Sequence, residues 1–538
     1  MGYQIVEIEN REYCLLLDQN AQRCTLDDAA GFAARHKFAA VELRGVPYDT
    51  ERHFDPVTQQ GDSVGGAAVL IERKTLDAVG GLDPDLPPAA AMADLSARLR
   101  SAGARMGYDP FAVVECEPKQ GLEQYLDTVY GRYLLTCKFG TAQQRRDAFQ
   151  ALLQVIRSPK HFPGVRKALL RGLPAVMRKA GRLKRYNHLS LKDVLENREL
   201  RGSCRLTPFT QAPLVSVVIR THKRKEVLRR TLQCLYWQTY KNFEIVVIED
   251  GEETAGEMIR KDFAGLNIRY FNTGAPVGRG RAGNIGIEKS RGEYVCFLDD
   301  DDYYYPDYIE LNLARMLESG AELILSSIMA FEIDVHSRDP FSFDIKKIYP
   351  VIFDHLNLLD MCVKCRVPMT GAMFLRSLYD RVGGMREDID GDEDWAMWLR
   401  YWKVARRIDD TKPDIPRAVS MFGYPADPEA ARRRLAAYEV YDRVMLSDPG
   451  LCYTIPAEKL KDLIRQQKKD LAHLYRIGSL QQLLETRKAE DAWTPAGEGE
   501  TMLVTAKQLN GLYHALLCAA AQQLQQGTLL QWLEQDDV

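Results

Sequence analysis

Short apolar runs that end in polar residues recur through the middle of the chain. Residues 215–219 and 243–248 are apolar and rich in β-branched side chains, and the helical pattern of residues 226–237 separates them. This order predicts a βαβ unit with two parallel strands, and further short strands are predicted over residues 268–271 and 294–298. Because the carboxyl ends of parallel strands meet at one edge of a sheet, the polar residues after each run are expected to line a ligand site.

Four consecutive acids follow the last of these strands: Asp299, Asp300, Asp301 and Asp302. Carboxylate oxygens are the ligands that Mg²⁺ and Mn²⁺ prefer, and these ions in turn suit diphosphates. The alternative is a solvated acidic turn in which one Asp caps the next helix. Residues 303–307, with Pro306 near the first turn, are predicted to begin that helix.

A stretch rich in Gly and Arg, residues 278–281, lies between the third and fourth strands. Its glycines let the backbone approach a ligand closely, and the guanidinium groups of Arg279 and Arg281 can bind a phosphate or a carboxylate through two hydrogen bonds. The alternative is a solvated basic loop. A helix is predicted to follow over residues 282–289.

Several motifs, taken in order, resemble the nucleotide-binding half of the family 2 glycosyltransferases, which have the GT-A fold: residues 215–219 with Thr221, Glu249-Asp250-Gly251, Asn284, and Asp299-Asp300-Asp301. Later motifs at residues 370–374, 382–384 and 391–400 resemble the acceptor half. The resemblance covers residues 212–423. It implies an α/β fold in which a Rossmann-like nucleotide-binding sheet is joined to an acceptor half.

The resemblance also implies roles for the polar residues of the first half. Asp250 is expected to accept a hydrogen bond from the base of a nucleotide, and Arg220 and Thr221 are expected to line the base and the ribose. Asp299 is expected to contact the ribose and to join Asp301 in holding Mn²⁺ or Mg²⁺.

The residues after the first strand depart from the family pattern Pro-Thr-Tyr-Asn. His222 and Lys223 stand where the family has an aromatic and an amide residue, so the identity of the base stays open. His222 either stacks on the base or caps a loop. Arg279 and Arg281 are expected to help neutralise the diphosphate.

In the acceptor half, the resemblance implies that Asp394, the second acid of the pair Glu393-Asp394, is the general base that takes a proton from the attacking hydroxyl. A helix is predicted to begin here, and its amino terminus is expected to keep Asp394 ionised. The alternative is that Asp394 only caps this helix. Attack from the face opposite the leaving group implies inversion of the anomeric configuration.

The composition indicates a protein of several globular units. The chain has 538 residues, of which 46% are hydrophobic and 27% charged, and its formal net charge of -3 carries no nucleic-acid signature. Cys362 and Cys365 form a pair without a second pair, so reduced thiols are expected, with a zinc or redox role as the alternative. No signal peptide or membrane span is expected, which predicts a cytoplasmic protein, at most peripheral on the inner face of the cytoplasmic membrane.

Residues 1–118 contain an echo of the acceptor half. Residues 65–69, 79–83 and 94–99 resemble its three motifs, but Ala93 stands where the pair has Glu, and no acidic run precedes Asp94. We therefore expect a partial, degenerate glycosyltransferase-like unit that scaffolds or positions the acceptor.

Residues 119–207 are expected to form a helical, basic connector to the catalytic segment, residues 208–424. Residues 157–192 carry many Lys and Arg residues and no acid, and part of this stretch is amphipathic. Such a stretch suits an anionic membrane surface, and the acceptor would then be a lipid-linked glycan. Nucleic-acid binding is the rival, although no recognisable module accompanies it, and a plain solvated linker stays open.

Residues 425–538 are predicted to be helical, over residues 428–445, 459–484 and 502–533. A stripe of Leu460, Ile464, Leu471, Leu474 and Tyr475 is expected to pack in a core, with self-association as the second use.

The predicted function is a metal-assisted, inverting transfer of a sugar from a nucleotide-diphosphate donor to a hydroxyl of a glycan or lipid-linked glycan on a bacterial surface-glycan pathway. A non-catalytic glycan-binding or scaffolding protein is the alternative. A nucleotidyltransferase would be expected to show a glycine-rich motif after the first strand, and residues 220–224 have no glycine.

Overall fold

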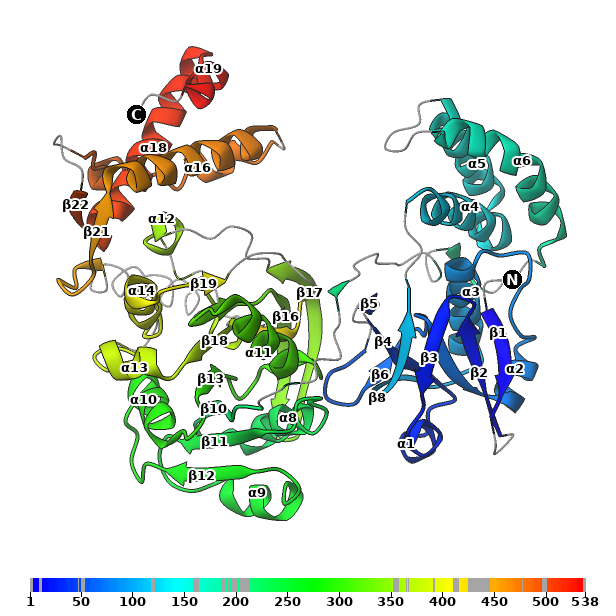
Figure 1. Cartoon of the computed structure of the whole chain (residues 1–538), viewed down its shortest axis with the longest axis horizontal. Helices are drawn as coiled ribbons and strands as arrows, with labels where there is room; N and C mark the ends of the chain where they lie inside the picture. Colours follow the sequence, from blue (N-terminus) through cyan, green and yellow to red (C-terminus); the bar gives the residue numbers. More distant parts are fainter. Residues whose placement is uncertain are drawn as a thin grey trace. The chain divides into compact units, whose positions relative to one another are not determined.

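The computed structural model describes residues 3–8, 12–46, 48–49, 54–117, 121–157, 164–184, 189–191, 194, 202–203, 209, 212–351, 358–363, 365, 367–389, 392–409, 416–423, 446–476, 478–495 and 501–535. The chain forms two compact units (Figure 1). The first unit comprises Met1–Pro208 with two short pieces, Gln233–Thr239 and Tyr305–Asp307, and the second unit comprises the rest.

The first unit is built on a mixed sheet in the order β1-β2-β7-β4-β8-β3, with β6 paired to β8. Its strands are β1 (Tyr3–Glu7), β2 (Tyr13–Asp18), β3 (Ala21–Thr25), β4 (Ala40–Val46), β6 (Gln60–Gly61), β7 (Ala68–Glu72) and β8 (Met106–Cys116). Strands β5 (Tyr48–Asp49) and β9 (Gly202–Ser203) form a separate pair. The helices are α1 (Ala29–His36), α2 (Arg73–Ala78), α3 (Pro88–Ser101), α4 (Leu122–Phe139), α5 (Ala142–Arg157) and α6 (Val165–Arg182).

A parallel sheet with antiparallel strands at one side forms the centre of the second unit, in the order β12-β11-β10-β13-β18-β15-β19. Its strands are β10 (Val215–Thr221), β11 (Phe243–Glu249), β12 (Ile268–Asn272), β13 (Tyr294–Phe297), β15 (Leu323–Leu325), β18 (Ala372–Leu375) and β19 (Ile408–Asp409). The first four run parallel, and the continuous apolar runs of β10, β11 and β13 fit strands buried on both faces. The predicted α/β fold is confirmed.

The helices of the second unit connect these strands. They are α8 (Lys225–Leu235), α9 (Gly256–Asp262), α10 (Arg279–Lys289), α11 (Tyr308–Ser319), α12 (Leu358–Met361), the short turn η1 (Met369–Gly371), α13 (Ser377–Val382) and α14 (Trp395–Val404). α8 and α10 lie near their predicted positions, since both sequences carry a helical apolar period.

A second sheet in this unit has the order β14-β20-β16-β17. Its strands are β14 (Tyr303–Tyr304), β16 (Ile328–Arg338), β17 (Phe341–Val351) and β20 (Ala418–Gly423). The prediction that residues 303–307 begin a helix was therefore wrong at its start. Tyr303 and Tyr304 pair with Val419 and Ala418, and the helix begins only at Tyr308.

The carboxyl-terminal region is helical but also contains a pair of strands, β21 (Cys452–Pro456) and β22 (Thr501–Thr505). Its helices are α16 (Ala457–Arg476), α17 (Leu480–Leu484), α18 (Ala506–Gln526) and α19 (Leu529–Glu534), and η2 (Ala489–Asp491) is a short turn. The start of the helix predicted over residues 502–533 was wrong, because residues 501–505 pair with β21. The helix predicted over residues 428–445 lies outside the described residues.

The apolar stripe of α16 packs inside the second unit. Leu460, Ile464 and Leu471 are buried in its main core, and Leu474 packs against that core. Tyr475 is exposed. Core packing, the first expectation for this stripe, is confirmed.

Four strands of the first sheet repeat the order and direction of four strands of the second unit. In both β2-β7-β4-β8 and β13-β18-β15-β19, the first two pairs are antiparallel and the third is parallel. In both sets, the second strand in this order (β7 or β18) is followed along the chain by a six-residue helix, a pair of glycines and a longer helix.

Candidate active site

The acidic run, Asp299, Asp300, Asp301 and Asp302, lies directly after β13. The neighbouring parallel strand β10 ends at Thr221, so the run lies at the carboxyl edge of the parallel sheet, as predicted. Asp300 and Asp302 are buried, whereas the side chains of Asp299 and Asp301 are 35% and 30% exposed. The two acids that the resemblance selected are thus the two that a ligand can reach.

Buried carboxylates need nearby donors, and this run has several. The guanidinium of Arg224 forms ion pairs with both Asp300 and Asp301, the latter at 3.0 Å between Nη1 and Oδ2. Asp302 accepts hydrogen bonds from the hydroxyl of Thr370 and from the backbone N–H of Met421, the latter at 2.8 Å. The sequence analysis assigned no site role to Arg224 or Thr370.

These surroundings separate the protonation behaviour of the four acids. Burial alone would raise the pKa of Asp299, but the guanidinium groups of Arg220, Arg279 and Arg224 bring it below its ordinary value. Burial raises the pKa of Asp300 to about 7, although Arg224 opposes the rise. Burial and the charges of Asp301 and Asp299 raise the pKa of Asp302 well above its ordinary value.

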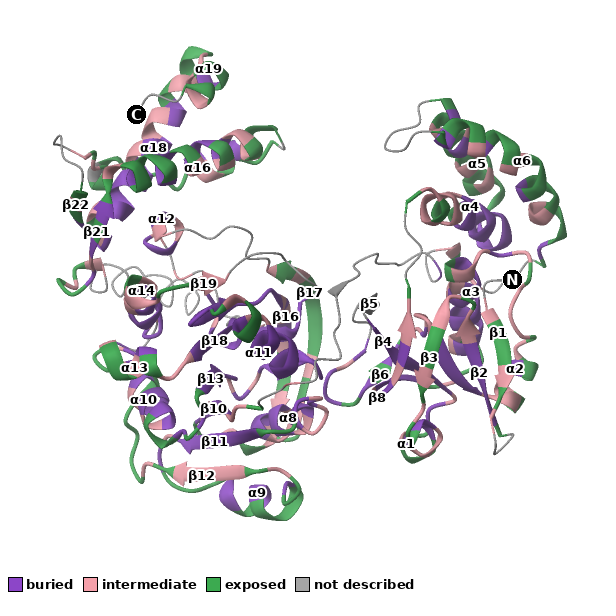
Figure 2. Cartoon of the chain, in the orientation of Figure 1, coloured by how far each residue is buried: buried purple, intermediate pink, exposed green. Residues whose placement is uncertain are grey.

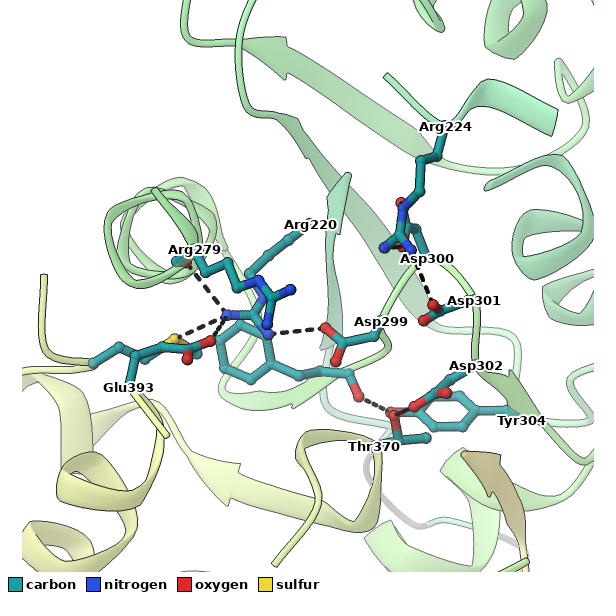
Figure 3. A network of polar contacts seen from close by, with 12 residues as sticks. Arg220, Arg224, Arg279, Asp299, Asp300, Asp301, Asp302, Tyr304, Thr370 and Glu393 are labelled. Atoms are coloured by element: carbon teal, nitrogen blue, oxygen red, sulfur yellow. Dashed lines mark hydrogen bonds and ion pairs between the residues drawn. The ribbon is translucent and has the colours of Figure 1, made fainter. Parts of the chain in front are cut away.

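Arg220 connects the acidic run to the acceptor half (Figure 3). Its guanidinium donates to Oδ1 of Asp299 at 2.9 Å and to Oε1 of Glu393 at 2.7 Å, and its side chain is only 10% exposed. A Cβ atom at position 283 would lie 3.4 Å from Cδ of Arg220 and 2.6 Å from Sδ of Met385, so Gly283 makes room for this arrangement. Two carboxylates thus pair with the guanidinium of Arg220, which the resemblance expects to line the base and the ribose.

Glu393 and Asp394 lie at the start of α14 and are both largely buried. Asp394 occupies the cap position, but its side chain forms no capping hydrogen bond. Burial, followed by the charge of Glu393, raises the pKa of Asp394 to about 8, and the guanidinium of Arg220 acts in the opposite direction. Burial thus opposes the effect expected of the helix amino terminus, and the pKa of Asp394 lies above its ordinary value.

The two arginines of the Gly-rich stretch have different surroundings. Arg279 lies beside the acidic run, and its carbonyl oxygen accepts a hydrogen bond from Arg220 at 3.3 Å (Figure 3). Arg281 instead pairs with Glu288 at 2.9 Å and Glu387 at 3.4 Å on an exposed surface. The structure therefore does not bring Arg281 to the acidic run.

Asn284 holds the segment before the acid pair against α10. Its side-chain amide donates to the carbonyl oxygen of Met385 at 3.0 Å and to Glu387 at 2.8 Å, and its oxygen accepts from the N–H of Met385 at 2.8 Å. A Cβ atom at position 384 would lie 2.1 Å from Oδ1 of Asn284, so this close approach requires Gly384.

The residues predicted to hold the nucleotide lie together at the ends of β10 and β11. Thr221 is buried, and its carbonyl oxygen accepts from the N–H of Asp250 at 2.8 Å. Nδ1 of His222 contacts the carbonyl oxygen of Asp250. The carboxylate of Asp250 accepts from the N–H groups of Val277 at 2.6 Å and Gly278 at 3.0 Å, so in this structure it orders the Gly-rich loop.

A pocket of about 290 Å³ opens beside Asp301. Three charged residues line it: Arg224, Arg279 and Asp301. The other lining residues are Val227, Ile333, Val335, Phe341, Met421, Phe422 and Gly423.

The exposed acids fit a divalent cation. The ion pairs with Arg220 and Arg224 engage one oxygen each of Asp299 and Asp301, so each carboxylate has a second oxygen for a metal. Mg²⁺ and similar ions commonly bind through one or two carboxylates together with substrate phosphates.

The thiol of Cys365 lies near the proposed base. One ligand atom each of Cys365, Asp392 and Asp394 lies within 4.8 Å of the others. Burial, followed by the charges of Asp394 and Asp392, raises the pKa of Cys365 well above its ordinary value. The thiol therefore stays protonated, as expected for a reduced, inert cysteine.

Most residues of this site lie within a segment that matches a known protein family. Residues 216–383 match the family described as Glycosyl transferase family 2. The match contains the acidic run, Arg224 and Asn284, and it ends ten residues before Glu393.

Several bacterial glycosyltransferases are related in sequence. An uncharacterised glycosyltransferase of Rickettsia typhi is 27% identical over 202 residues, which is 36% of this chain and 61% of the relative. The uncharacterised glycosyltransferase YwdF of Bacillus subtilis is 29% identical, covering 36% of this chain and 69% of the relative. The amylovoran biosynthesis glycosyltransferase AmsB of Erwinia amylovora is 35% identical, covering 18% of this chain and 34% of the relative. The chain spans less than two thirds of the Rickettsia relatives it matches, at 61%, 28% and 32% of their lengths.

Among solved structures, a mannosyltransferase from Pyrobaculum calidifontis in complex with GDP-Man and Mn²⁺ is 18% identical, with a TM-score of 0.33, covering 58% of this chain and 87% of that chain. The family match contains the acidic run, both arginines that pair with it at the strand ends, and Asn284. The second unit of this chain therefore contains a glycosyltransferase domain of family 2.

Proposed function

We propose that this chain transfers a sugar, with inversion, from a nucleotide-diphosphate donor to a hydroxyl of a glycan or lipid-linked glycan, with Asp394 as general base. The observation that carries this proposal is the Arg220 bridge, which ties the acid pair Glu393-Asp394 to the acidic run. A non-catalytic scaffolding protein is the alternative, and the retention of Asp299, Asp301 and Asp394 around this bridge argues against it.

The donor side of the proposal rests on the strand ends. His222 and Asp250, with Thr221 behind them, would form the floor for the base and ribose, and Asp299 and Asp301 would hold the cation. When bound, Mn²⁺ or Mg²⁺ neutralises the charge that develops on the leaving nucleoside diphosphate. Arg279 at the pocket would add a second cationic group near the diphosphate.

The acceptor side of the proposal rests on Asp394. Its carboxylate takes the proton of the acceptor hydroxyl while the hydroxyl oxygen forms a bond to the anomeric carbon. The bond from this carbon to the diphosphate oxygen breaks on the opposite face, so the configuration inverts. The pathway proposed is the assembly of a bacterial surface polysaccharide, and the related AmsB is named as a glycosyltransferase of amylovoran biosynthesis.

Donor use is tested with a panel of nucleotide sugars and either Mn²⁺ or Mg²⁺. We expect one donor to release nucleoside diphosphate in a metal-dependent reaction, because the diphosphate must be neutralised to leave. We expect Asp301→Ala to abolish this release and Asp394→Asn to lower the rate at least 100-fold, as general-base catalysis typically contributes 10²–10⁴-fold.

Asp94→Asn is the matched control, because Asp94 lies at the corresponding place in the first unit but is fully buried and paired with Arg98 and Lys138. Its rate should equal that of the wild type. Release of pyrophosphate instead of nucleoside diphosphate would indicate nucleotidyl transfer. If no donor in the panel released nucleoside diphosphate, and no nucleotide with metal shifted the melting temperature, the non-catalytic scaffolding protein would be favoured.

The acidity of Asp394 predicts the pH profile. A general base acts in its deprotonated form, so kcat/KM should rise with pH, reach half of its maximum near the pKa of Asp394 at about 8, and level off above it. The measurement is the initial rate with the identified donor between pH 5.5 and 9.5. A profile already flat from pH 6 would show that Asp394 does not limit the rate as the base.

Arg220 is proposed as a positioning residue. Replacing it with Met leaves Asp299 and Glu393 without their shared cation, and breaking a buried ion pair from one side costs roughly 3–5 kcal/mol. We expect Arg220→Met to lower the free energy of unfolding of the full chain by about this amount. Arg281→Met is the control, since an exposed pair contributes at most about 1 kcal/mol. Equal stability of the two variants in urea titrations would contradict the bridge.

A peripheral membrane contact is proposed for the basic stretch within residues 157–192. Val165, Leu169 and Val176 of α6 are buried inside the first unit, so most of its amphipathic pattern reflects internal packing. On its outer face, Leu170 and Met177 are 50% and 41% exposed. Exposed basic side chains accompany them: Arg166, Lys167, Arg171 and Arg178. Among the helices that the structure describes, none has the length and apolar character needed to cross a membrane.

Flotation with liposomes tests this contact. The full chain should float with vesicles that contain anionic lipid and remain unbound with neutral vesicles, because each basic residue near the surface contributes about 1 kcal/mol. Arg171→Glu combined with Arg178→Glu should reduce flotation at least tenfold, whereas Arg145→Glu combined with Arg146→Glu on α5 should not. Binding that ignores both lipid charge and salt would remove the membrane proposal.

For the first unit we propose a partial copy of the acceptor half, which the shared strand order and directions support. Asp94 cannot act as a base there, since Arg98 at 2.6 Å and Lys138 at 2.7 Å neutralise it inside the unit. The proposed divisions are residues 1–118, 119–207, 208–424 and 425–538. We also propose that residues 425–538 mediate self-association. The chain would act at the cytoplasmic face of the membrane and would not bind nucleic acid.

A further inference from the structure

The guanidinium of Arg224 lies between a buried acid and an exposed acid of the acidic run (Figure 3). Its Nε donates to Oδ2 of Asp300 at 3.1 Å, and its Nη1 donates to Oδ2 of Asp301 at 3.0 Å. The side chain of Asp300 is fully buried, whereas that of Asp301 is 30% exposed. One guanidinium therefore neutralises both an acid that no ligand reaches and an acid that is proposed to hold the cation.

The position of Arg224 is fixed by the helix that follows it. Its carbonyl oxygen accepts from the N–H of Leu228 at 3.0 Å, so Arg224 lies at the start of α8. The hydroxyl of Thr231 on this helix contacts the carbonyl oxygens of Asp300 at 2.6 Å and Asp302 at 3.1 Å. Leu228 and Thr231 are fully buried, so α8 turns one side to the interior (Figure 2). The guanidinium thus belongs to the folded site and is not a loose surface side chain.

A divalent cation on Asp301 would lie beside this guanidinium. The ion pair engages Oδ2, which leaves Oδ1 of the same small carboxylate for the cation. Like charges repel more strongly at a partly buried site than in bulk water. Arg220 pairs with Asp299 at 2.9 Å and Arg279 lines the pocket, so two more guanidinium groups balance the acidic run. In the free protein, an arriving cation therefore meets acids whose charge is already largely neutralised.

We propose that Arg224 competes with the divalent cation for Asp301, so that the acidic run binds the cation weakly until an anionic group in the pocket draws the guanidinium away. This inference rests on the proposed function and deepens it by naming the residue that controls the cation. A guanidinium pairs with phosphate oxygens as it does with a carboxylate. Arg224 lines the pocket of about 290 Å³ beside Asp301, so a diphosphate there would accept its hydrogen bonds and release the acid.

The competing explanation is that Arg224 only compensates the buried charge of Asp300. A buried carboxylate does need a donor, and the contacts of Nε and Nη2 supply it. This explanation leaves the pair with Asp301 without a purpose, because a partly exposed acid can be solvated by water. The guanidinium is itself 34% exposed, so it can turn toward a ligand in the pocket. These observations favour competition for Asp301.

The test is titration of the full chain with Mn²⁺ in the absence of nucleotide, followed by the electron paramagnetic resonance signal of free Mn²⁺. We expect weak binding by the wild type and at least tenfold tighter binding by Arg224→Met, because the competing charge is removed. Arg224→Lys keeps the charge and should stay within threefold of the wild type. Arg281→Met is the matched control, since Arg281 pairs with Glu288 on an exposed surface, and it should leave the affinity unchanged.

A second pair of variants covers a folding defect of Arg224→Met, in which the carboxylate of Asp300 loses its partner. Asp300→Asn removes this buried charge, and Asp300 is too deeply buried to bind the cation itself. The variant that combines Arg224→Met with Asp300→Asn should bind Mn²⁺ at least tenfold more tightly than Asp300→Asn alone. Adding Asp301→Ala to it should abolish this gain, because the cation then loses its ligand.

Unchanged or weaker Mn²⁺ binding on loss of the Arg224 side chain, in both backgrounds, would overturn the proposal. So would equal tightening by Arg224→Lys and Arg224→Met, since charge would then not be the cause. Donor turnover by the wild type separates this failure from that of the proposed function. Metal-dependent release of nucleoside diphosphate without the tightening removes only the competition, whereas release that needs no metal, with no Mn²⁺ bound by any variant, also removes the cation from the proposed function.

Discussion

Keeping several carboxylates at the buried end of one strand is the constraint on which the second unit depends. The acidic run follows β13, and two of its members are almost fully removed from water. Ions of this kind persist inside a protein only when cations and hydrogen-bond donors surround them. Arg220 and Arg224 from the end of β10, Thr370 from η1 and the backbone of β20 meet this need. The acidic run thus brings three other segments of the chain together.

The same contacts determine which acids of the site are ionised. Asp299 is ionised beside Arg220, while Asp300 and Asp302 are pushed toward their neutral forms by burial. The partly exposed acids can then meet a ligand while the buried ones hold the loop. Across the bridge, Asp394 is less acidic than a free carboxylate, which makes it a stronger base once deprotonated.

Local patterns in the sequence were enough to predict the central strands of the second unit. The apolar runs predicted β10, β11, β12 and β13 to within two residues. For β10, β11 and β13 the reason is that strands buried on both faces must be largely apolar. Tyr303 and Tyr304 were assigned wrongly, since their strand exists only through pairing with residues 418 and 419, far along the chain. The bridge from Arg220 to Glu393 was not predicted, for the same reason. Glu393 lies 173 residues away from Arg220, and no local pattern announces such a pair.

The first unit contains two short pieces of chain besides Met1–Pro208. One is Gln233–Thr239, which is the end of α8 and the turn after it, and the other is Tyr305–Asp307, which follows the acidic run. Inside that unit, the indole N–H of Trp237 donates to the carbonyl oxygen of Val57 at 2.9 Å, and the amide of Gln238 donates to that of Tyr305. The chain thus crosses between units several times, and no single cut separates them. A gene fragment that encoded only residues 208–424 would therefore contain these pieces without the rest of the unit in which they pack.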